Sequence, residues 1–210
     1  MSDEATNPAP PVVVVEERDS IAVVRLNRPA ERNALTTPLL ERLTEIVSAL
    51  REREDISTII FTGSAGVFAS GADIRELSGL TPEGARVFAL CGQRLMRMIA
   101  EAGQLTLAAI DGYCMGGGLD LALACDVRCA SPGSVFAHPG ARLGIITGWG
   151  GTQRLPHLIG ATQALEMFLT ARRFTGEEAL ELGLVGRLGD PALECALGLA
   201  GEASKKKCRR

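Results

Sequence analysis

Two glycine-rich segments of the chain hold the residues that are best suited to do chemistry. The first is Gly66-Val67-Phe68-Ala69-Ser70-Gly71-Ala72-Asp73-Ile74-Arg75, and the second is Asp111-Gly112-Tyr113-Cys114-Met115-Gly116-Gly117-Gly118-Leu119-Asp120. In each segment a strand is expected to lead through a loop into a helix, whose first N–H groups are unpaired and lie at the positive end of the helix dipole. Glycine lets a ligand oxygen approach such a backbone closely. Two facing junctions of this kind predict an oxyanion hole with donors from separate segments, although close backbone packing alone would also explain either set of glycines.

The glycine-rich segments do not match the known phosphate-binding motifs. A P-loop needs Gly-Lys followed by Ser or Thr, which the sequence lacks. Neither residues 112–118 nor residues 148–153 have the spacing of a dinucleotide-binding loop. A nucleotide site is therefore not expected.

The elements around these segments predict an α/β protein. Two β-branched runs, at 12–16 and 21–26, flank the polar residues 17–20 and indicate a hairpin. A helix is expected to begin with Thr37 as its N-cap and Pro38 as its first residue, because apolar residues then recur at helical spacing up to Leu50. Further strands are expected at 58–61, 105–110, 127–130 and 134–137, and further helices from near 72 and at 82–100, 116–124, 153–159, 163–170, 176–182 and 191–203. This succession of strands and helices favours α/β architecture over a bundle or a sandwich.

The two glycine-rich segments also carry a resemblance to a known family. The sequences FASGADIREL at 68–77 and GYCMGGGLDLALACD at 112–126 resemble the two signature segments of the enoyl-CoA hydratase/isomerase (crotonase) superfamily. Supporting matches are NRP at 27–29 with NAL at 33–35, the run from LG at 143–144 to GTQRL at 151–155, and TGEEA at 175–179 with GLV at 183–185. The matches keep their order and cover about residues 12–188, so the chain is identified as a member of this superfamily.

The resemblance implies a spiral of ββα units that binds an acyl-coenzyme A (acyl-CoA) thioester. It implies that the backbone N–H groups of Ala72 and Gly117 hold the thioester carbonyl oxygen, and that Asp73, Ile74 and Arg75 contact the CoA moiety. Acyl-CoA chemistry at the α or β carbon passes through an enolate, and losing one donor to this charge typically costs about 10²–10³ in rate. CoA is then part of the substrate, and we expect no separate cofactor and no metal.

The resemblance also points to the acid/base positions, where this sequence departs from hydratases of the superfamily. Such hydratases carry two glutamates near the oxyanion hole. The first matches Asp120, one helical turn after Gly117 and roughly on the same face, although an acid that only complements the helix dipole is the alternative. The second matches Gly140, which has no proton to offer, whereas general acid–base catalysis contributes about 10²–10⁴-fold.

Three explanations of Gly140 remain open. His138 is a candidate substitute because histidine titrates near neutrality, although alternation along a strand would point it away from the pocket. In the naphthoyl-CoA synthase branch, which also has glycine in this loop, recruited bicarbonate is the candidate base, but the distinctive first signature of that branch is missing here. The space beside Gly140 would alternatively admit a bulkier acyl group.

The resemblance implies 2-enoyl-CoA hydration, in fatty acid metabolism, as the default activity. Isomerisation, decarboxylation and thioester hydrolysis are alternatives within the same class, and a catalytically degenerate acyl-CoA-binding protein is the alternative from another class. RNA binding occurs in one branch of the superfamily. We do not expect a nucleic-acid partner, because the formal net charge is -3 and basic residues are paired with acidic neighbours, as in Arg51-Glu52-Arg53-Glu54.

The composition is typical of a folded cytoplasmic protein. Apolar residues make up 46% of the chain, and no apolar run approaches the roughly 20 residues of a membrane helix, so no membrane partner is expected. The six cysteines form no CxxC pair and are expected to be free thiols in a reducing compartment. With His138 and His157 as the only histidines, a zinc site is not expected.

The two ends of the chain differ from its centre. Residues 1–11 are acidic and contain prolines, and are expected to be disordered, whereas residues 12–188 are expected to form the core. Members of the superfamily generally continue with helices that cover the acyl pocket and help to form a trimer, often a dimer of trimers. Residues 189–210 are therefore expected to be a truncated version of this helical part, and a homotrimer or dimer of trimers is expected if this end permits. All the lysines fall within 205–207, which indicates either a solvated basic tail or an end altered by truncation or a shifted reading frame.

Overall fold

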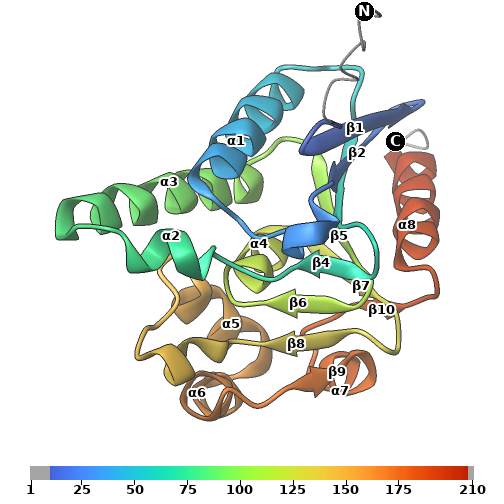
Figure 1. Ribbon diagram of the computed structural model, residues 1–210. Coiled ribbons are helices and arrows are strands. Elements are labelled where there is room, and N and C mark those ends of the chain that lie inside the picture. Colours follow the sequence, from blue (N-terminus) through green and yellow to red (C-terminus); the bar gives the residue numbers. More distant parts are fainter. Residues whose placement is uncertain (1–9, 208–210) are drawn as a thin grey trace, which may run out of the picture.

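Two β-sheets organise the part of the chain that the structure, a computed structural model, describes, namely residues 10–207 (Figure 1). The larger sheet has the order β1-β2-β3-β5-β7-β10, in which β1 and β2 are antiparallel and the other neighbours are parallel. The smaller sheet has the order β4-β6-β8-β9. The strands are β1 (Val13–Arg18), β2 (Ile21–Leu26), β3 (Thr58–Thr62), β4 (Val67–Ala69), β5 (Leu105–Ile110), β6 (Tyr113–Met115), β7 (Val127–Ala130), β8 (Val135–Ala137), β9 (Phe174–Thr175) and β10 (Arg187–Leu188).

Successive pairs of strands build the spiral of ββα units that the resemblance implied. In β3-β4, β5-β6 and β7-β8, the first strand joins the larger sheet and the second joins the smaller one, and helices follow each pair. The fold prediction is therefore confirmed. The helices are the 3₁₀ segments η1 (Pro29–Glu31) and η2 (Pro139–Leu143), and α1 (Thr37–Arg51), α2 (Ile74–Ser78), α3 (Pro82–Ala100), α4 (Gly117–Ala124), α5 (Gly151–Ile159), α6 (Ala161–Thr170), α7 (Gly176–Glu181) and α8 (Ala192–Lys207).

The larger sheet is buried on both faces because its side chains alternate between two apolar clusters. Val24 and Phe61 point to the main core, where α1, α3 and α4 contribute side chains, whereas Val23 and Ile60 point to the opposite face. That opposite face is covered by α8 (red in Figure 1), through its small residues Ala192, Ala196 and Ala200, spaced one helical turn apart. The segment that begins at residue 189 thus packs on the sheet.

Several element boundaries differ from the sequence predictions. The first long helix begins at Thr37, with Thr36 and not Thr37 as its N-cap. Thr37 lies inside the helix, and its N–H and hydroxyl both donate to the carboxylate of Glu76. The helix expected near residue 72 begins at Ile74, because the carboxylate of Asp73 accepts the N–H groups of Arg75 and Glu76. The strands β4, β6, β9 and β10 were not expected; each has only two or three residues and is fixed by its neighbour in the sheet.

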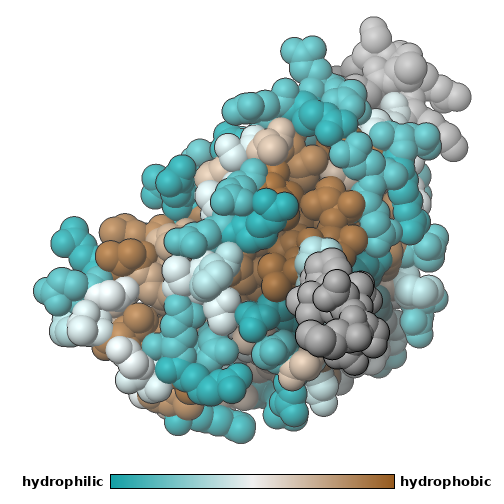
Figure 2. Space-filling model, turned by 45° about the horizontal axis from the view of Figure 1, so that its top comes forward, coloured by the Kyte–Doolittle hydropathy of each residue, from teal (hydrophilic) through white to brown (hydrophobic). Residues whose placement is uncertain are grey.

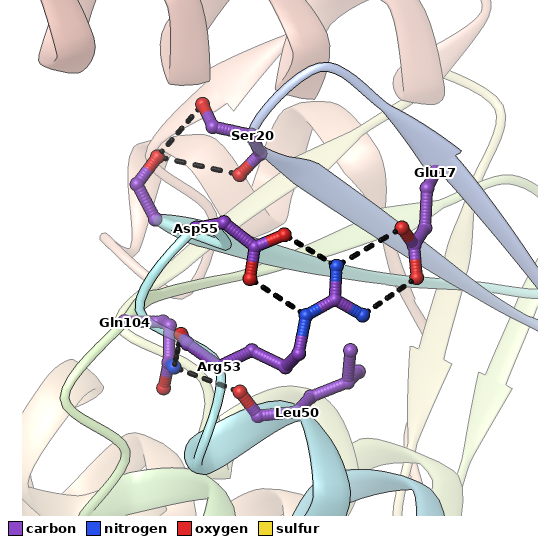
Figure 3. A network of polar contacts seen from close by, with 7 residues as sticks. Glu17, Ser20, Leu50, Arg53, Asp55 and Gln104 are labelled. Atoms are coloured by element: carbon purple, nitrogen blue, oxygen red, sulfur yellow. Dashed lines mark hydrogen bonds and ion pairs between the residues drawn. The ribbon is translucent and has the colours of Figure 1, made fainter.

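One arginine ties the first hairpin to the segment after α1 (Figure 3). The guanidinium of Arg53 donates to Asp55 at 2.6 Å and to both carboxylate oxygens of Glu17 on β1, at 3.1 and 3.2 Å. Nearby, the side-chain amide of Gln104 donates to the Leu50 carbonyl at 2.9 Å, which closes the end of α1. Arg53 is thus paired, as expected, but with partners other than its direct neighbours in the chain.

The surface carries apolar side chains among the polar ones. Figure 2 shows some of them on the left, where Figure 1 places α2 and the start of α3, and Ile74, Val87 and Leu90 are exposed there. None of the helices within residues 10–207 is long and apolar enough to cross a membrane. The described cysteines, Cys91, Cys114, Cys125, Cys129 and Cys195, are free thiols. Cys208, the side chains of the basic tail and most of the segment expected to be disordered lie outside the described residues.

Candidate active site

The two glycine-rich junctions are in direct contact. Gly71 has a φ of +99°, and a Cβ there would lie 2.9 Å from the Met115 carbonyl oxygen and 3.1 Å from the amide nitrogen of Gly117. A Cβ on Gly112 would lie 1.7 Å from the Gly66 carbonyl oxygen. No side chain fits at either position, so these glycines serve close packing, and this packing brings the two helix starts together.

The backbone amides of Ala72 and Gly117 are both available at this junction. Leu35 pairs with Ala72 in a parallel bridge, in which the Leu35 N–H bonds to the Gly71 carbonyl at 2.8 Å and the Asp73 N–H bonds to the Leu35 carbonyl at 3.4 Å. This bridge does not use the N–H of Ala72. Gly117 is the first residue of α4, so its N–H has no acceptor within the helix. Both residues line the same cavity.

A buried asparagine holds the first junction in place. The side-chain amide of Asn33 donates to the carbonyls of Val67 and Phe68 in β4, at 2.7 and 3.3 Å, and its carbonyl oxygen accepts the N–H of Arg28 at 2.8 Å. Asn33 is fully buried. Asn33 belongs to the NAL motif at 33–35 that matches the family, and its role here is to position the strand that leads to Ala72.

The junctions open into a cavity of about 270 Å³ between α2 and α3 on one side and η2, the loop at 145–149 and α6 on the other. Its walls are mostly apolar and include Leu77, Phe88, Ile145, Ile146 and Phe168. Its polar lining includes Ser70, Asp120, His138 and Thr147. An apolar cavity with a few convergent polar groups is the usual form of a small-molecule site.

The three residues expected to contact CoA are arranged differently from one another. Ile74 lines the cavity and is 57% exposed. Asp73 uses its carboxylate to cap α2, and the exposed guanidinium of Arg75 lies 3.6 Å from that carboxylate. Neither Asp73 nor Arg75 is part of the cavity wall. They lie at its edge, where α2 begins.

Asp120 is a buried carboxyl group at the bottom of the cavity, with 1% exposure. Its Oδ2 accepts a hydrogen bond from the Thr147 hydroxyl. Burial raises the pKa of Asp120 to about 7, although Thr147, Arg154 and the Trp149 N–H act in the opposite direction. The group therefore exchanges a proton near neutral pH, which a solvated acid complementing the helix dipole would not do.

His138 enters the cavity, contrary to the expectation from strand alternation. The strand β8 ends at Ala137, so His138 lies beyond it, at the start of η2, where the alternation no longer applies. Its Nε2 lies 3.5 Å from Oδ1 of Asp120, and its ring packs against that of Phe168 with 5.0 Å between centroids. Burial lowers the pKa of His138 to about 4, so the ring is neutral at neutral pH.

Gly140 lines the cavity, but the room for a side chain there is occupied. A Cβ would lie 2.5 Å from the carbonyl oxygen of Ile145, whose N–H bonds to the Gly140 carbonyl at 3.0 Å. The protein's own backbone fills the place that a side chain would take. In that direction Gly140 leaves no opening for a larger acyl group.

Trp149 is a wall residue that sequence reasoning did not single out. A Cβ on Gly92 of α3 would lie 2.2 Å from its Nε1, and a Cβ on Gly117 would lie 2.3 Å from its Cζ3, so the indole fills a slot between two glycines. Its ring centroid is 5.2 Å from that of Phe88. Trp149 also lines a second cavity of about 500 Å³, shared with Arg97 and Arg154, and thus separates the two. Trp149 is the only tryptophan in the chain, and this was the one feature of the sequence that could have drawn attention to it.

Among residues 10–207, no three His, Cys, Asp or Glu side chains are grouped as metal ligands would be. The polar groups on the cavity wall are backbone amides, the carboxyl group of Asp120, the imidazole of His138 and the hydroxyls of Ser70 and Thr147. Backbone donors beside a carboxyl group of shifted pKa can stabilise an oxyanion and move a proton at an adjacent carbon.

Comparisons with known proteins agree with this arrangement. The family model described as enoyl-CoA hydratase/isomerase matches residues 16–192. The chain is 36% identical over 180 residues to a crotonyl-CoA hydratase of Syntrophomonas wolfei, covering 85% of this chain and 69% of that protein. It is 40% identical over 189 residues to the human mitochondrial enoyl-CoA hydratase domain-containing protein 2, covering 87% and 65%.

Solved structures show the same fold. The crystal structure of an enoyl-CoA hydratase from Bacillus anthracis matches with a TM-score of 0.89 and 34% identity, over 92% of this chain and 77% of that one. The structure of Pseudomonas aeruginosa DspI matches with a TM-score of 0.89 and 32% identity, over 96% and 84%. Sequence, fold and site together place this chain in the enoyl-CoA hydratase/isomerase family.

Proposed function

We propose that this protein binds an acyl-CoA thioester and stabilises its enolate, with hydration of a 2-enoyl-CoA as the reaction. The observation that carries the proposal is that Ala72, Gly117 and Asp120 line one cavity, with a carboxyl group whose pKa burial raises to about 7. The two N–H groups bind the thioester oxygen where negative charge develops, and Asp120 transfers the proton at the α carbon. The name of the relative from Syntrophomonas wolfei supports this reaction.

The CoA moiety enters as part of the substrate, and the proposal includes no separate cofactor or metal. Ile74 contacts CoA at the cavity edge, and the exposed Arg75 is available to its phosphate groups. Asp73 contributes by capping α2, because its carboxylate is already engaged with the amides of Arg75 and Glu76.

The proposal is tested by following the loss of the enoyl thioester when the protein is mixed with crotonyl-CoA. Wild type is expected to turn over, and Asp120→Asn to lose about 10²–10⁴ in kcat. Butyryl-CoA binding, measured by calorimetry, is expected to be similar in both, because Asn keeps the shape of the side chain. A wild type that binds butyryl-CoA without any turnover of crotonyl-CoA would instead indicate a degenerate acyl-CoA-binding protein.

We also propose that the protein assembles as a homotrimer or a dimer of trimers. We further propose that it is cytoplasmic and acts in fatty acid metabolism. The assembly is supported by apolar side chains that α6 exposes one helical turn apart, Leu165 at 56% and Leu169 at 68%. Light scattering is expected to give a trimer or hexamer mass for wild type. Leu165→Lys with Leu169→Lys is expected to reduce it, and a monomeric wild type would contradict the assembly.

A further inference from the structure

Two buried polar atoms that face each other across the cavity floor lack a hydrogen-bond partner. They are Oδ1 of Asp120 and Nε2 of His138, on side chains that are 1% and 4% exposed. An unpartnered buried polar atom costs about 1–3 kcal/mol. Two such atoms, 3.5 Å apart on residues that line one cavity, indicate a small polar molecule that lies beside the pair and contacts both.

We propose that this molecule is the water that adds to the substrate, and that His138 is a further catalytic residue that accepts its proton. His138 then performs the step that no carboxylate at position 140 can perform. The inference rests on the proposed function, and it specifies which side chain activates water and how the proton returns.

The steps balance with the groups present. Nε2 of His138 takes a proton from the water while the water oxygen bonds to the β carbon, and the electron pair of the double bond moves into the thioester enolate held by Ala72 and Gly117. Protonated Asp120 then gives its proton to the α carbon, and the enolate becomes the thioester again. Finally the proton on Nε2 passes to Oδ1 of Asp120, which restores both groups.

The surroundings of the pair support this assignment. The hydroxyl of Thr147 holds Oδ2 of Asp120, which leaves Oδ1 for the exchange. Phe168 packs on the His138 ring and limits its rotation. The absence of a side chain at Gly151 leaves room beside the pair, since a Cβ there would lie 2.2 Å from Oδ1 of Asp120 and 3.2 Å from Cε1 of His138. The acid is protonated and the imidazole neutral over one pH range, as an acid and a base that work together must be.

The test separates water activation from enolate formation. Hydration of crotonyl-CoA needs both, whereas exchange of the α protons of butyryl-CoA in D₂O needs the oxyanion hole and Asp120 but no attacking water. We expect His138→Gln to reduce hydration about 10²–10⁴-fold and to retain α-proton exchange. Asp120→Asn is expected to lose both. His157→Gln, at the only other histidine, which is exposed on α5, is the matched control and is expected to retain both.

The outcomes distinguish the two levels of the proposal. If wild type hydrates crotonyl-CoA and His138→Gln does so equally well, His138 is not the base and the proposed function stands. If His138→Gln loses hydration and exchange together while its thermal melt equals that of wild type, His138 does not act on the water alone, and the inference is overturned. If wild type hydrates nothing, both the inference and the proposed function fail.

Discussion

The indole of Trp149 lies directly on the backbone of Gly117, so close that a Cβ on Gly117 would stand 2.3 Å from the Cζ3 atom of the ring. One of the two proposed oxyanion donors is thus held against an aromatic wall. Because the indole is itself fixed between Gly92 and Gly117, the position of this amide depends on the packing between α3 and α4.

Gly117→Ala is expected to displace the indole or the amide. We expect hydration of crotonyl-CoA to fall about 10²–10³-fold, as when an oxyanion donor is lost. Gly133→Ala is the matched control, because a Cβ there meets no atom within 4 Å. Activity and thermal melting of the two variants provide the measurement, and equal activity would show that the packing of Trp149 on Gly117 does not control the position of this amide.

Trp149→Phe is expected to change which acyl chains are accepted. The smaller ring removes part of the wall between the two cavities, so longer 2-enoyl-CoA substrates gain room. We expect the ratio of kcat/KM for octenoyl-CoA to that for crotonyl-CoA to rise about tenfold, the effect of one or two methylene groups in an apolar pocket. A ratio that stays constant, with both values lowered alike, would assign Trp149 a purely structural part.

Asp120 and His138 are expected to make opposite contributions to stability in the same pH window. The folded-state pKa of Asp120 is raised from 3.8 to about 7, so its contribution is present below pH 4 and is lost as the pH rises to 7. The folded-state pKa of His138 is lowered from 6.5 to about 4, so its contribution is present above pH 6.5 and is lost as the pH falls to 4. Each is on the order of 3–4 kcal/mol, and in wild type they largely cancel.

Single variants are expected to expose these two contributions. Relative to wild type, Asp120→Asn should become more stable as the pH rises from 4 to 6.5, and His138→Gln should become less stable between pH 4 and 7. Urea unfolding at each pH measures the free energies, and three parallel curves would contradict the assignment of these pKa values.

Asn33→Ala is expected to loosen the first junction. It removes the side-chain donor to the carbonyls of Val67 and Phe68 and the acceptor of the Arg28 N–H, while the Val67 carbonyl keeps the N–H of Ser64, and we expect a cost of about 2–3 kcal/mol in the free energy of unfolding. Asn27→Ala is the control, because its side chain donates only to the Pro11 carbonyl near the surface, and should cost less than about 1 kcal/mol. Equal losses in urea unfolding would argue against the role given to Asn33.

The long elements could be predicted from the sequence because their own periodicity determines them. On α1, the apolar residues from Leu39 to Leu50 are buried as their spacing indicated. The strands β5 and β7 lie at the expected residues, because a β-branched or apolar run between turn residues suffices to define them. By contrast, β9 and β10 have two residues each, too few for any pattern, and only their neighbours in the sheets define them.

The site shows the same division. Ala72, Gly117 and Asp120 could be assigned to the site from the sequence, because the glycines and the order of their segments match the family. All three line the cavity. His138 was expected to point away by alternation along the strand, but the strand was also expected to end at Ala137, as β8 does, so the alternation did not extend to His138. Thr147 belongs to a loop that matched the family, but its bond to Asp120 joins residues 27 positions apart and depends on tertiary packing alone.

The backbone contact between Gly140 and Ile145 leaves no place for a carboxylate side chain at position 140. A glutamate reintroduced at 140 would meet the carbonyl oxygen of Ile145 before its carboxyl group reached the substrate, so the turn from 140 to 145 would have to be rebuilt with it. A two-glutamate arrangement would therefore need a rebuilt turn as well as glutamates at 120 and 140, whereas the acid and the imidazole already lie 3.5 Å apart.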